Sequence, residues 1–327
     1  MEHPRDQKDP TETETRPPLS VVVPVYNEAP GLNDLVTHLG AAIPRDAEVI
    51  IVDDGSTDES PQALREIARR DRRFRVVRFR RNFGKSMALL AGFRRARGAL
   101  VATIDADLQE DPREIAKLAE HLRNGFDLVS GWRRTRRDPW RKVLGSRVFN
   151  FVTSLLSGVR FQDINCGLKV FRREVVEELV IGGGFHRFLP LLAHSRGFRV
   201  TEVEVAHEPR RHGASRYRSE RILQGLLDLA VILFLVRQEG RPARLFAGAG
   251  AALGALGFGI CAFIAYLRLA YGTIGSRYPL LGLGLVLMVV GVQLFSLGLF
   301  GELLAHHFRS HRPFEPALWE DEAEERA

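Results

Sequence analysis

Cysteine is scarce in this chain of 327 residues, which contains only two. One of them, Cys261, lies inside a long apolar run, so the sequence argues against a disulfide framework and against a cysteine-rich zinc site. The N-terminus also lacks the apolar segment of a secretory signal, although it carries charges and prolines. We therefore expect residues 1–18 to form a disordered tail and the globular part to occupy a reducing compartment.

Acidic residues are fewer than basic ones, 40 against 47, which gives a formal net charge of +7. This balance favours an anionic partner, whether nucleic acid, a phosphorylated small molecule or a membrane surface. The sequence has no recognisable nucleic-acid reading module, and its glycine-rich stretch at 182–187 does not match the Gly-x-Gly-x-x-Gly fingerprint. A phosphorylated molecule and a membrane are therefore the expected partners, and nucleic acid is not.

Charged residues are absent from two long stretches, 245–267 and 279–301. Each has about 23 residues, and about 20 are needed to cross the hydrocarbon core of a bilayer. Two buried helices of a soluble core are the alternative, but such helices usually carry a polar stripe. The short loop between the stretches predicts an antiparallel transmembrane hairpin over 241–305, in which Gly250 and Gly254 would let the helices pack closely.

The basic residues around this hairpin are unevenly placed. Its flanks contain more arginines (Arg237, Arg241, Arg244, Arg309 and Arg312) than its loop (Arg268 and Arg277). By the positive-inside rule, we expect the rest of the chain to be cytoplasmic. This includes an acidic C-terminal tail over 306–327. The expected protein is therefore a multi-pass protein of the inner cell membrane. Residues 219–240 contain an apolar run too short to span, which predicts an interfacial amphipathic helix; a buried helix of the soluble domain is the alternative.

The soluble part, residues 19–218, alternates short β-branched runs with helical patterns. One of these helices is expected to have Ser60 as its N-cap and Pro61 in its first turn. Such alternation predicts an α/β domain with a mostly parallel sheet covered on both faces. Ligands of such sheets bind at the carboxyl ends of the strands.

Polar motifs follow three of the predicted strands, in VPVYNE, IVDDGSTD and TIDADLQ. Asp53 and Asp54 precede a turn-like Gly-Ser, where a carboxylate can accept hydrogen bonds from a base or a ribose. Asp105 and Asp107, with Gln109, offer the oxygen ligands that Mg²⁺ or Mn²⁺ prefers beside a diphosphate. The alternative is a strand-to-helix loop whose carboxylates only cap the next helix.

Several longer motifs occur in order along residues 19–236: VPVYNEAPGL, VDDGSTD, RRNFGKSMALLAGFRRARG, DADLQEDP, NCGLKVFRREVV, HRFLPLLA and RRHGASRY. Together they resemble the family 2 glycosyltransferases, specifically the polyprenyl-phosphate glycosyltransferases related to dolichyl-phosphate mannose synthase. The resemblance implies a GT-A type nucleotide-sugar-binding domain over 19–218. The two apolar stretches resemble the membrane anchor that a subset of this family carries.

The resemblance also implies site residues. The implied donor-binding residues are Pro24, Tyr26, Asn27, Glu28, Asp53, Asp54, Lys85, Asp105, Ala106, Asp107 and Ser215. The implied metal ligands, for Mg²⁺ or Mn²⁺, are Asp105, Asp107 and Gln109. Catalysis would depend on Asp105, Asp107, Arg211 and Arg216. The family more often has lysine at the position of Arg216, and the two residue types are not interchangeable.

The acceptor implied by the resemblance is a polyprenyl phosphate, undecaprenyl or dolichyl. Its phosphate is expected at Arg133, Lys142, Ser146 and Arg147. The alternative for the basic residues among them is that they form a solvated surface that attracts lipid headgroups. A phosphate monoester is already an anion at neutral pH and needs no general base. We therefore expect direct, inverting transfer of a hexosyl group from a nucleotide-diphosphate sugar.

Two rival functions and several properties remain open. The nearer rival is a processive polysaccharide synthase of the same superfamily, which would show a Q/R-x-x-R-W element and more spans. The other is a non-catalytic membrane scaffold. The presence of both aspartates of the Asp-x-Asp (DxD) motif, Asp105 and Asp107, disfavours it. The base and sugar of the donor stay open among UDP-glucose, UDP-N-acetylglucosamine and GDP-mannose, and a homo-oligomer is also left open.

Overall fold

The computed structural model describes residues 17–134, 140–179, 184–208, 228–229, 231–232, 242–310 and 318–320. Contacts divide the chain into two units. The first comprises Met1–Ala230 with Glu315–Ala327, and the second comprises Val231–Phe314.

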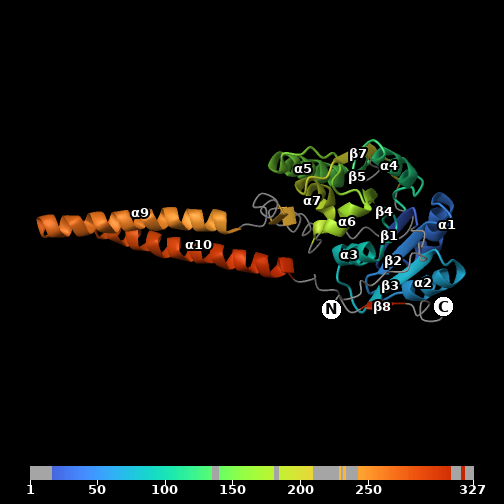
Figure 1. Cartoon of the computed structure of the whole chain (residues 1–327), viewed down its shortest axis with the longest axis horizontal. Coiled ribbons are helices and arrows are strands. Elements are labelled where there is room, and N and C mark those ends of the chain that lie inside the picture. Colours follow the sequence, from blue (N-terminus) through green and yellow to red (C-terminus); the bar gives the residue numbers. More distant parts are fainter. Residues whose placement is uncertain are drawn as a thin grey trace, which may run out of the picture. The chain divides into compact units, whose positions relative to one another are not determined.

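A central sheet organises the first unit (Figure 1). Its strands are β1 Leu19–Val25, β2 Glu48–Asp53, β3 Phe74–Phe79, β4 Leu100–Thr103, β5 Leu128–Trp132, β6 Lys169–Arg172, β7 Val200–Glu204 and β8 Leu318–Glu320. They lie in the order β7-β5-β6-β4-β1-β2-β3-β8. The pairs β4–β1, β1–β2, β2–β3 and β5–β7 are parallel, whereas β6 is antiparallel to both of its neighbours and β8 is antiparallel to β3.

Helices cover both faces of this sheet. Along β1, Val21 and Val23 join one buried cluster and Val22 joins the other, as expected when successive side chains point to opposite faces. The first cluster takes residues from α1 Leu32–Ala42, α2 Ser60–Arg70 and α4 Glu114–Leu122, and the second from α3 Lys85–Arg95, α6 Arg173–Glu178 and α7 Leu189–Ser195. Every residue of β2 is buried, which is typical of a parallel strand covered on both sides.

Three further elements border the strand ends. They are the 3-10 helices η1 Ala29–Gly31 and η2 Phe185–Phe188 and the long helix α5 Trp140–Ser157. η2 packs against both α3 and α7. These elements bring residues far apart in sequence to the edge of the sheet where the parallel strands end.

The second unit consists mainly of two apolar helices, α9 Pro242–Tyr271 and α10 Tyr278–Ser310. Within them, Phe246–Tyr271 and Tyr278–Gly301 are long and apolar enough to cross a membrane. Many of their large apolar side chains are exposed. The prediction of an α/β domain with a mostly parallel sheet, followed by two apolar C-terminal helices, is confirmed.

Glycines let α9 and α10 approach at their backbones. A Cβ atom added at Gly250 would lie 2.5 Å from the carbonyl oxygen of Gly291, and one added at Gly257 would lie 2.5 Å from that of Gly284. A Cβ atom at Gly254 would meet nothing within 4 Å, although one at Gly291 would lie 2.6 Å from the Gly254 nitrogen. Close approach through small residues is common between membrane helices.

The predicted segment boundaries stay predictions. The interfacial helix over 219–240, the tail over 1–18 and the tail over 306–327 lie mostly outside the described residues.

Candidate functional site

The carboxyl ends of β4, β1 and β2 are adjacent, because β1 pairs in parallel with both of the others. The motifs that follow these strands therefore meet at one edge of the sheet. Pro24 belongs to the end of β1, and Asp53 is the last residue of β2. Asp105 follows β4 by two residues.

Hydrogen bonds from backbone N–H groups to side-chain oxygens join the motifs that follow β1 and β2. The Asn27 backbone N–H donates to Ser56 Oγ at 2.9 Å, and the Thr57 backbone N–H donates to Asn27 Oδ1 at 2.8 Å. Asn27 has a φ of 54°, a left-handed conformation that asparagine tolerates better than most residues. Tyr26 and Glu28, on either side, are half-buried at this edge.

Ser60 has a different role from the predicted one. It is the first residue of α2 rather than the N-cap, which is Glu59. Its hydroxyl accepts a hydrogen bond from the Glu28 N–H at 3.1 Å instead. The side chain therefore joins the two motifs.

Asp53 and Asp54 are both buried and hydrogen-bonded within the protein. Asp53 Oδ1 accepts from the Ser56 N–H at 2.9 Å. The two oxygens of Asp54 accept from the N–H groups of Phe83 at 2.7 Å and Gly84 at 2.9 Å. Burial raises the pKa of Asp54, against the effect of these two bonds. Asp54 thus anchors the loop that leads into α3, a role the sequence did not reveal.

Gly55 allows this loop to approach. It has a φ of 71°, and a Cβ atom there would lie 2.7 Å from the Asn82 nitrogen. A side chain at this position would therefore push the loop away from β2. The approach sets the start of α3, and with it the position of Lys85.

Lys85 and Asp105 form an ion pair at the centre of the site. Lys85 begins α3, and its Nζ lies 2.5 Å from Asp105 Oδ1. Burial favours the neutral form of Asp105, but the Lys85 ammonium outweighs it and holds the pKa of the carboxyl below its usual range. Gly167, in NCGLK, leaves room for this carboxylate, since a Cβ atom there would lie 2.6 Å from Asp105 Oδ2.

The rest of the DxD loop is bent and tight. Leu108 has a φ of 55°, a strained conformation for a large apolar residue, and its side chain is buried. The Gln109 N–H donates to Asp107 Oδ1 at 3.3 Å, and Ala106 is buried. The bend places Asp105 and Asp107 on one short loop that ends at Gln109.

The donor atoms fit a hard divalent cation. Among the described residues, no three His, Cys, Asp or Glu side chains form a ready-made ligand group. Asp105, Asp107 and Gln109 offer two carboxylates and an amide oxygen, which suits Mg²⁺ or Mn²⁺ because these ions take one or two carboxylates and complete their shell with water and phosphate.

A second ion-pair cluster lies beside the first. Arg133 follows β5, and its guanidinium holds Asp163 through Nε at 2.7 Å and through Nη2 at 3.1 Å. Its Nη1 lies 3.3 Å from Oε1 of the buried Glu110. Burial raises the pKa of Glu110 to about 7, although Arg133 opposes the shift. Arg133 thus already has two carboxylate partners, neither of which the sequence identified.

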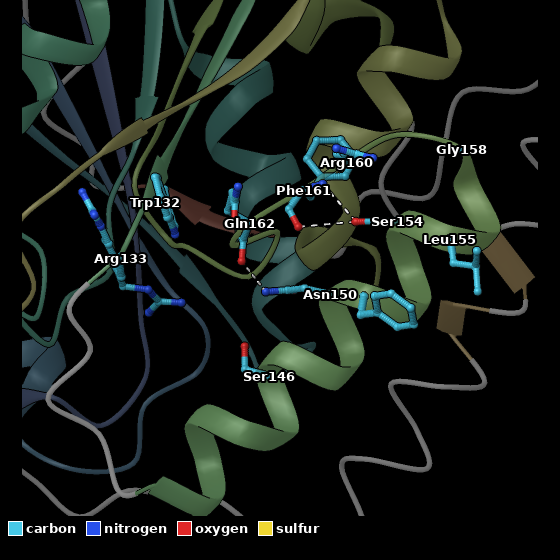
Figure 2. Close-up of a pocket in the computed structure, with 12 residues that line it drawn as sticks. Trp132, Arg133, Ser146, Asn150, Ser154, Leu155, Gly158, Arg160, Phe161 and Gln162 are labelled. Carbon is cyan, nitrogen blue, oxygen red and sulfur yellow. Dashed lines mark hydrogen bonds between the residues drawn. The ribbon is translucent and has the colours of Figure 1, made fainter.

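A cavity of about 860 Å³ opens beside Arg133 (Figure 2). Figure 2 shows Ser146, Asn150 and Ser154 on α5 facing the segment that carries Phe161 and Gln162. The Asn150 Nδ2 donates to the Gln162 carbonyl at 2.6 Å and fixes that segment. Of the four predicted acceptor-phosphate residues, Arg133 and Ser146 therefore line the same cavity.

The remaining predicted residues are only partly visible. Lys142 and Arg147 belong to α5, but their side chains lie outside the described part of the chain. Arg211, Ser215 and Arg216 lie outside it altogether. Their assignments stay predictions.

Comparisons with known proteins give consistent matches. The family model described as "Glycosyl transferase family 2" matches residues 20–180. The chain is 36% identical over 299 residues to the dodecaprenyl-phosphate galacturonate synthase of Rhizobium johnstonii, covering 89% of this chain and 88% of that protein. It is 38% identical over 300 residues to the undecaprenyl-phosphate 4-deoxy-4-formamido-L-arabinose transferase of Pseudomonas aeruginosa, covering 90% and 87%.

Solved structures share the fold. Glucosyl-3-phosphoglycerate synthase from Mycobacterium tuberculosis, in complex with Mn²⁺, UDP-glucose and glycerol 3-phosphate, matches with a TM-score of 0.51. The match covers 69% of this chain and 80% of that one at 21% identity. At this identity the likeness shows the fold alone.

Proposed function

The chain belongs to glycosyl transferase family 2, and on this premise we propose that it transfers a hexosyl group from a nucleotide-diphosphate sugar to a polyprenyl phosphate. Glycosyltransferase activity itself follows from the family and from the named relatives. The proposal adds that transfer inverts the anomeric carbon and takes place at the cytoplasmic face of the inner membrane. The two apolar helices and the arginines on their flanks support that location.

The observation that carries the proposal is the Lys85–Asp105 pair at the carboxyl edge of the sheet, with Asp107 on the same loop. The Lys85 ammonium and the carboxylates of Asp105 and Asp107 lie where an α/β sheet binds its ligand. A bound diphosphate would pair with the ammonium, and a bound cation would pair with the carboxylates. Asp105, Asp107 and Gln109 would hold Mg²⁺ or Mn²⁺, which supplies positive charge to the departing diphosphate when bound. The fold neighbour was solved with Mn²⁺ and UDP-glucose, which is consistent with this choice.

The acceptor side of the proposal depends on the cavity beside α5. Ser146, on α5, lines it together with Arg133. A phosphate monoester placed there is an anion at neutral pH, so it attacks the anomeric carbon without a general base. We propose that Arg211 and Arg216 stabilise the leaving diphosphate, because arginine binds phosphate oxygens in a fixed fork geometry.

The names of the relatives widen the choice of donor sugar. One is named for galacturonate and another for 4-deoxy-4-formamido-L-arabinose, and both names include a polyprenyl phosphate. The donor panel should therefore extend beyond glucose, N-acetylglucosamine and mannose to nucleotide-linked uronic acids and formamido-pentoses. Transfer of a pentosyl group would contradict the hexosyl part of the proposal.

The decisive experiment uses the full chain purified in detergent with Mn²⁺, undecaprenyl phosphate and this panel of labelled UDP- and GDP-sugars. We expect label from one donor to enter the lipid phase as a single sugar per lipid. Long saccharide chains would indicate a processive synthase instead. Nucleotide binding without transfer from any donor would indicate a scaffold and contradict the proposal.

A further inference from the structure

A histidine from outside the predicted site lies beside the Lys85–Asp105 pair. η2 carries His186, whose Nδ1 lies 2.9 Å from Ser86 Oγ. The backbone N–H of His186 donates to the same oxygen at 3.2 Å. Ser86 is buried and is the next residue after Lys85 in α3. Two hydrogen bonds thus fix the imidazole against the first turn of the helix that positions Lys85.

One of the two neutral tautomers lets this imidazole use the Ser86 hydroxyl as a donor. The Ser86 oxygen accepts the His186 backbone N–H, and its own hydroxyl proton can be donated to Nδ1. In this tautomer Nδ1 is an acceptor and the ring proton is on Nε2. Burial lowers the pKa of His186 well below its usual value, and the charges of Lys85 and Arg187 lower it further. The ring is therefore neutral at pH 7.

The Nε2–H group is a hydrogen-bond donor that no described residue accepts. The ring is close enough to Lys85 and Asp105 to feel both of their charges. A site with a fixed ammonium and a fixed neutral donor suits a phosphate oxygen, which accepts strong hydrogen bonds and carries negative charge. A neutral donor also adds no further positive charge beside Lys85.

We propose that His186 is a substrate-binding residue whose Nε2–H donates a hydrogen bond to a phosphate oxygen. The inference rests on the proposed function, which brings two sources of such oxygens to this edge of the sheet: the diphosphate of the donor and the phosphate of the lipid acceptor. A purely structural role, in which the ring only joins η2 to α3, makes a different prediction for the variants below.

Two isosteric substitutions separate the two ring nitrogens. His186→Asn places an amide near the Nδ1 position, so it keeps the bond to Ser86 and loses the distal donor. His186→Gln places its amide N–H near the Nε2 position and keeps the donor. The binding role predicts that Gln functions and Asn does not. The structural role predicts that Asn performs at least as well as Gln.

The measurements use the detergent-purified full chain. Calorimetric titration with UDP and with GDP, in the presence of Mn²⁺, gives the Kd for the diphosphate, and transfer assays give the KM for undecaprenyl phosphate. A lost hydrogen bond to a charged group weakens binding by about tenfold to a hundredfold, so we expect His186→Asn to raise one of these constants by that factor. A raised Kd identifies the donor diphosphate, and a raised KM alone identifies the acceptor phosphate.

The outcomes that overturn the inference are distinct from failure of the proposed function. If the wild-type protein binds neither nucleotide and transfers no sugar, both fail. If the wild type binds a nucleotide and His186→Asn leaves both constants unchanged, or if Gln is impaired as much as Asn, only the His186 assignment fails. His186→Phe is a second variant without a donor, in case Asn lowers the melting temperature. If Gln unfolds while Asn stays folded, the bond to Ser86 holds η2 on α3, the role is structural and the proposal is wrong.

Discussion

The two ion-pair clusters at the edge of the sheet differ in how far water reaches them. In the Lys85–Asp105 pair the side chains are 33% and 31% exposed. In the Arg133–Asp163 pair they are 12% and 1% exposed, and Glu110 is buried with them. A half-exposed pair can exchange its partner for a substrate charge. A buried pair cannot, because removing one member leaves the other charge unpaired in a poorly solvated place.

The comparison assigns different tasks to neighbouring charges. Under the proposed function, Lys85 and Asp105 would meet a diphosphate and a cation. Arg133 is held by two carboxylates and keeps β5 joined to the segment that carries Asp163. Under the proposed function, an acceptor phosphate in the adjoining cavity would contact Arg133 while its carboxylate partners stay in place.

The largest effect is expected on turnover, from Asp105→Asn. Removing this carboxylate should lower the transfer rate by about a thousandfold, the upper range for losing one preorganised electrostatic group. The free energy of unfolding should change by less than about 1 kcal/mol, because partly exposed pairs contribute little. Transfer assays and thermal melting measure the two effects.

Asp111→Asn is the matched control, since it makes the same change in the same loop. Its carboxylate pairs with the exposed Arg113 at 2.7 Å, so transfer should stay near the wild-type rate. A large loss of stability in Asp105→Asn would remove the distinction between the two clusters.

The second effect is on stability, from Arg133→Met. The substitution leaves Asp163 and Glu110 buried without their cation, which should lower the free energy of unfolding by about 3–5 kcal/mol. Arg134→Met is the matched control, because Arg134 pairs with Glu204 at 3.3 Å and is 65% exposed. Chemical denaturation of both variants measures the difference. Equal stability of the two variants would show that burial does not make the Arg133 cluster more important for folding than an exposed pair.

Much of the fold follows from local patterns in the sequence. The alternation of β-branched runs with helical patterns predicted a sheet covered on both faces, and the structure buries every residue of β2. The polar motifs after three predicted strands indicated the ligand-binding edge of the sheet. The two uncharged stretches predicted α9 and α10, because only apolar residues suit a membrane span.

Other features depend on contacts between residues far apart in the sequence. The strand β6 has only four residues and enters between β5 and β4 in the antiparallel sense, which no local pattern reveals. Asp163 lies thirty residues from Arg133, and the basic residues of GWRRTRRDPWRK look alike before folding. The bonds from Asp54 to Phe83 and Gly84 are equally non-local. Patterns located the strand ends, and tertiary structure decided which charges pair there.

The third effect is the pH dependence of stability, which Glu110 should dominate. Its pKa is raised from 4.5 to about 7 on folding, so the folded state binds the proton more tightly. The corresponding stability is present below pH 4.5 and is lost as pH rises through 7. Between pH 5 and 8 the free energy of unfolding should fall by about 2–3 kcal/mol. Glutamine cannot ionise, so Glu110→Gln should remove most of the difference in the free energy of unfolding between pH 5 and pH 8, as measured by chemical denaturation. If the difference stays the same, another group causes the pH dependence.

The smallest effect is expected from Gly167→Ala, at the glycine that packs against the Asp105 carboxylate. The added Cβ atom would lie 2.6 Å from Asp105 Oδ2 and must displace the carboxylate that pairs with Lys85. Transfer should fall by about tenfold, since small displacements of a reacting group slow catalysis steeply. The double variant with Asp105→Asn tests the cause, because two changes that act through one carboxylate are not additive. If Gly167→Ala lowers the rate further in the Asp105→Asn background, the glycine acts elsewhere and the half-exposed pair is not the group it positions.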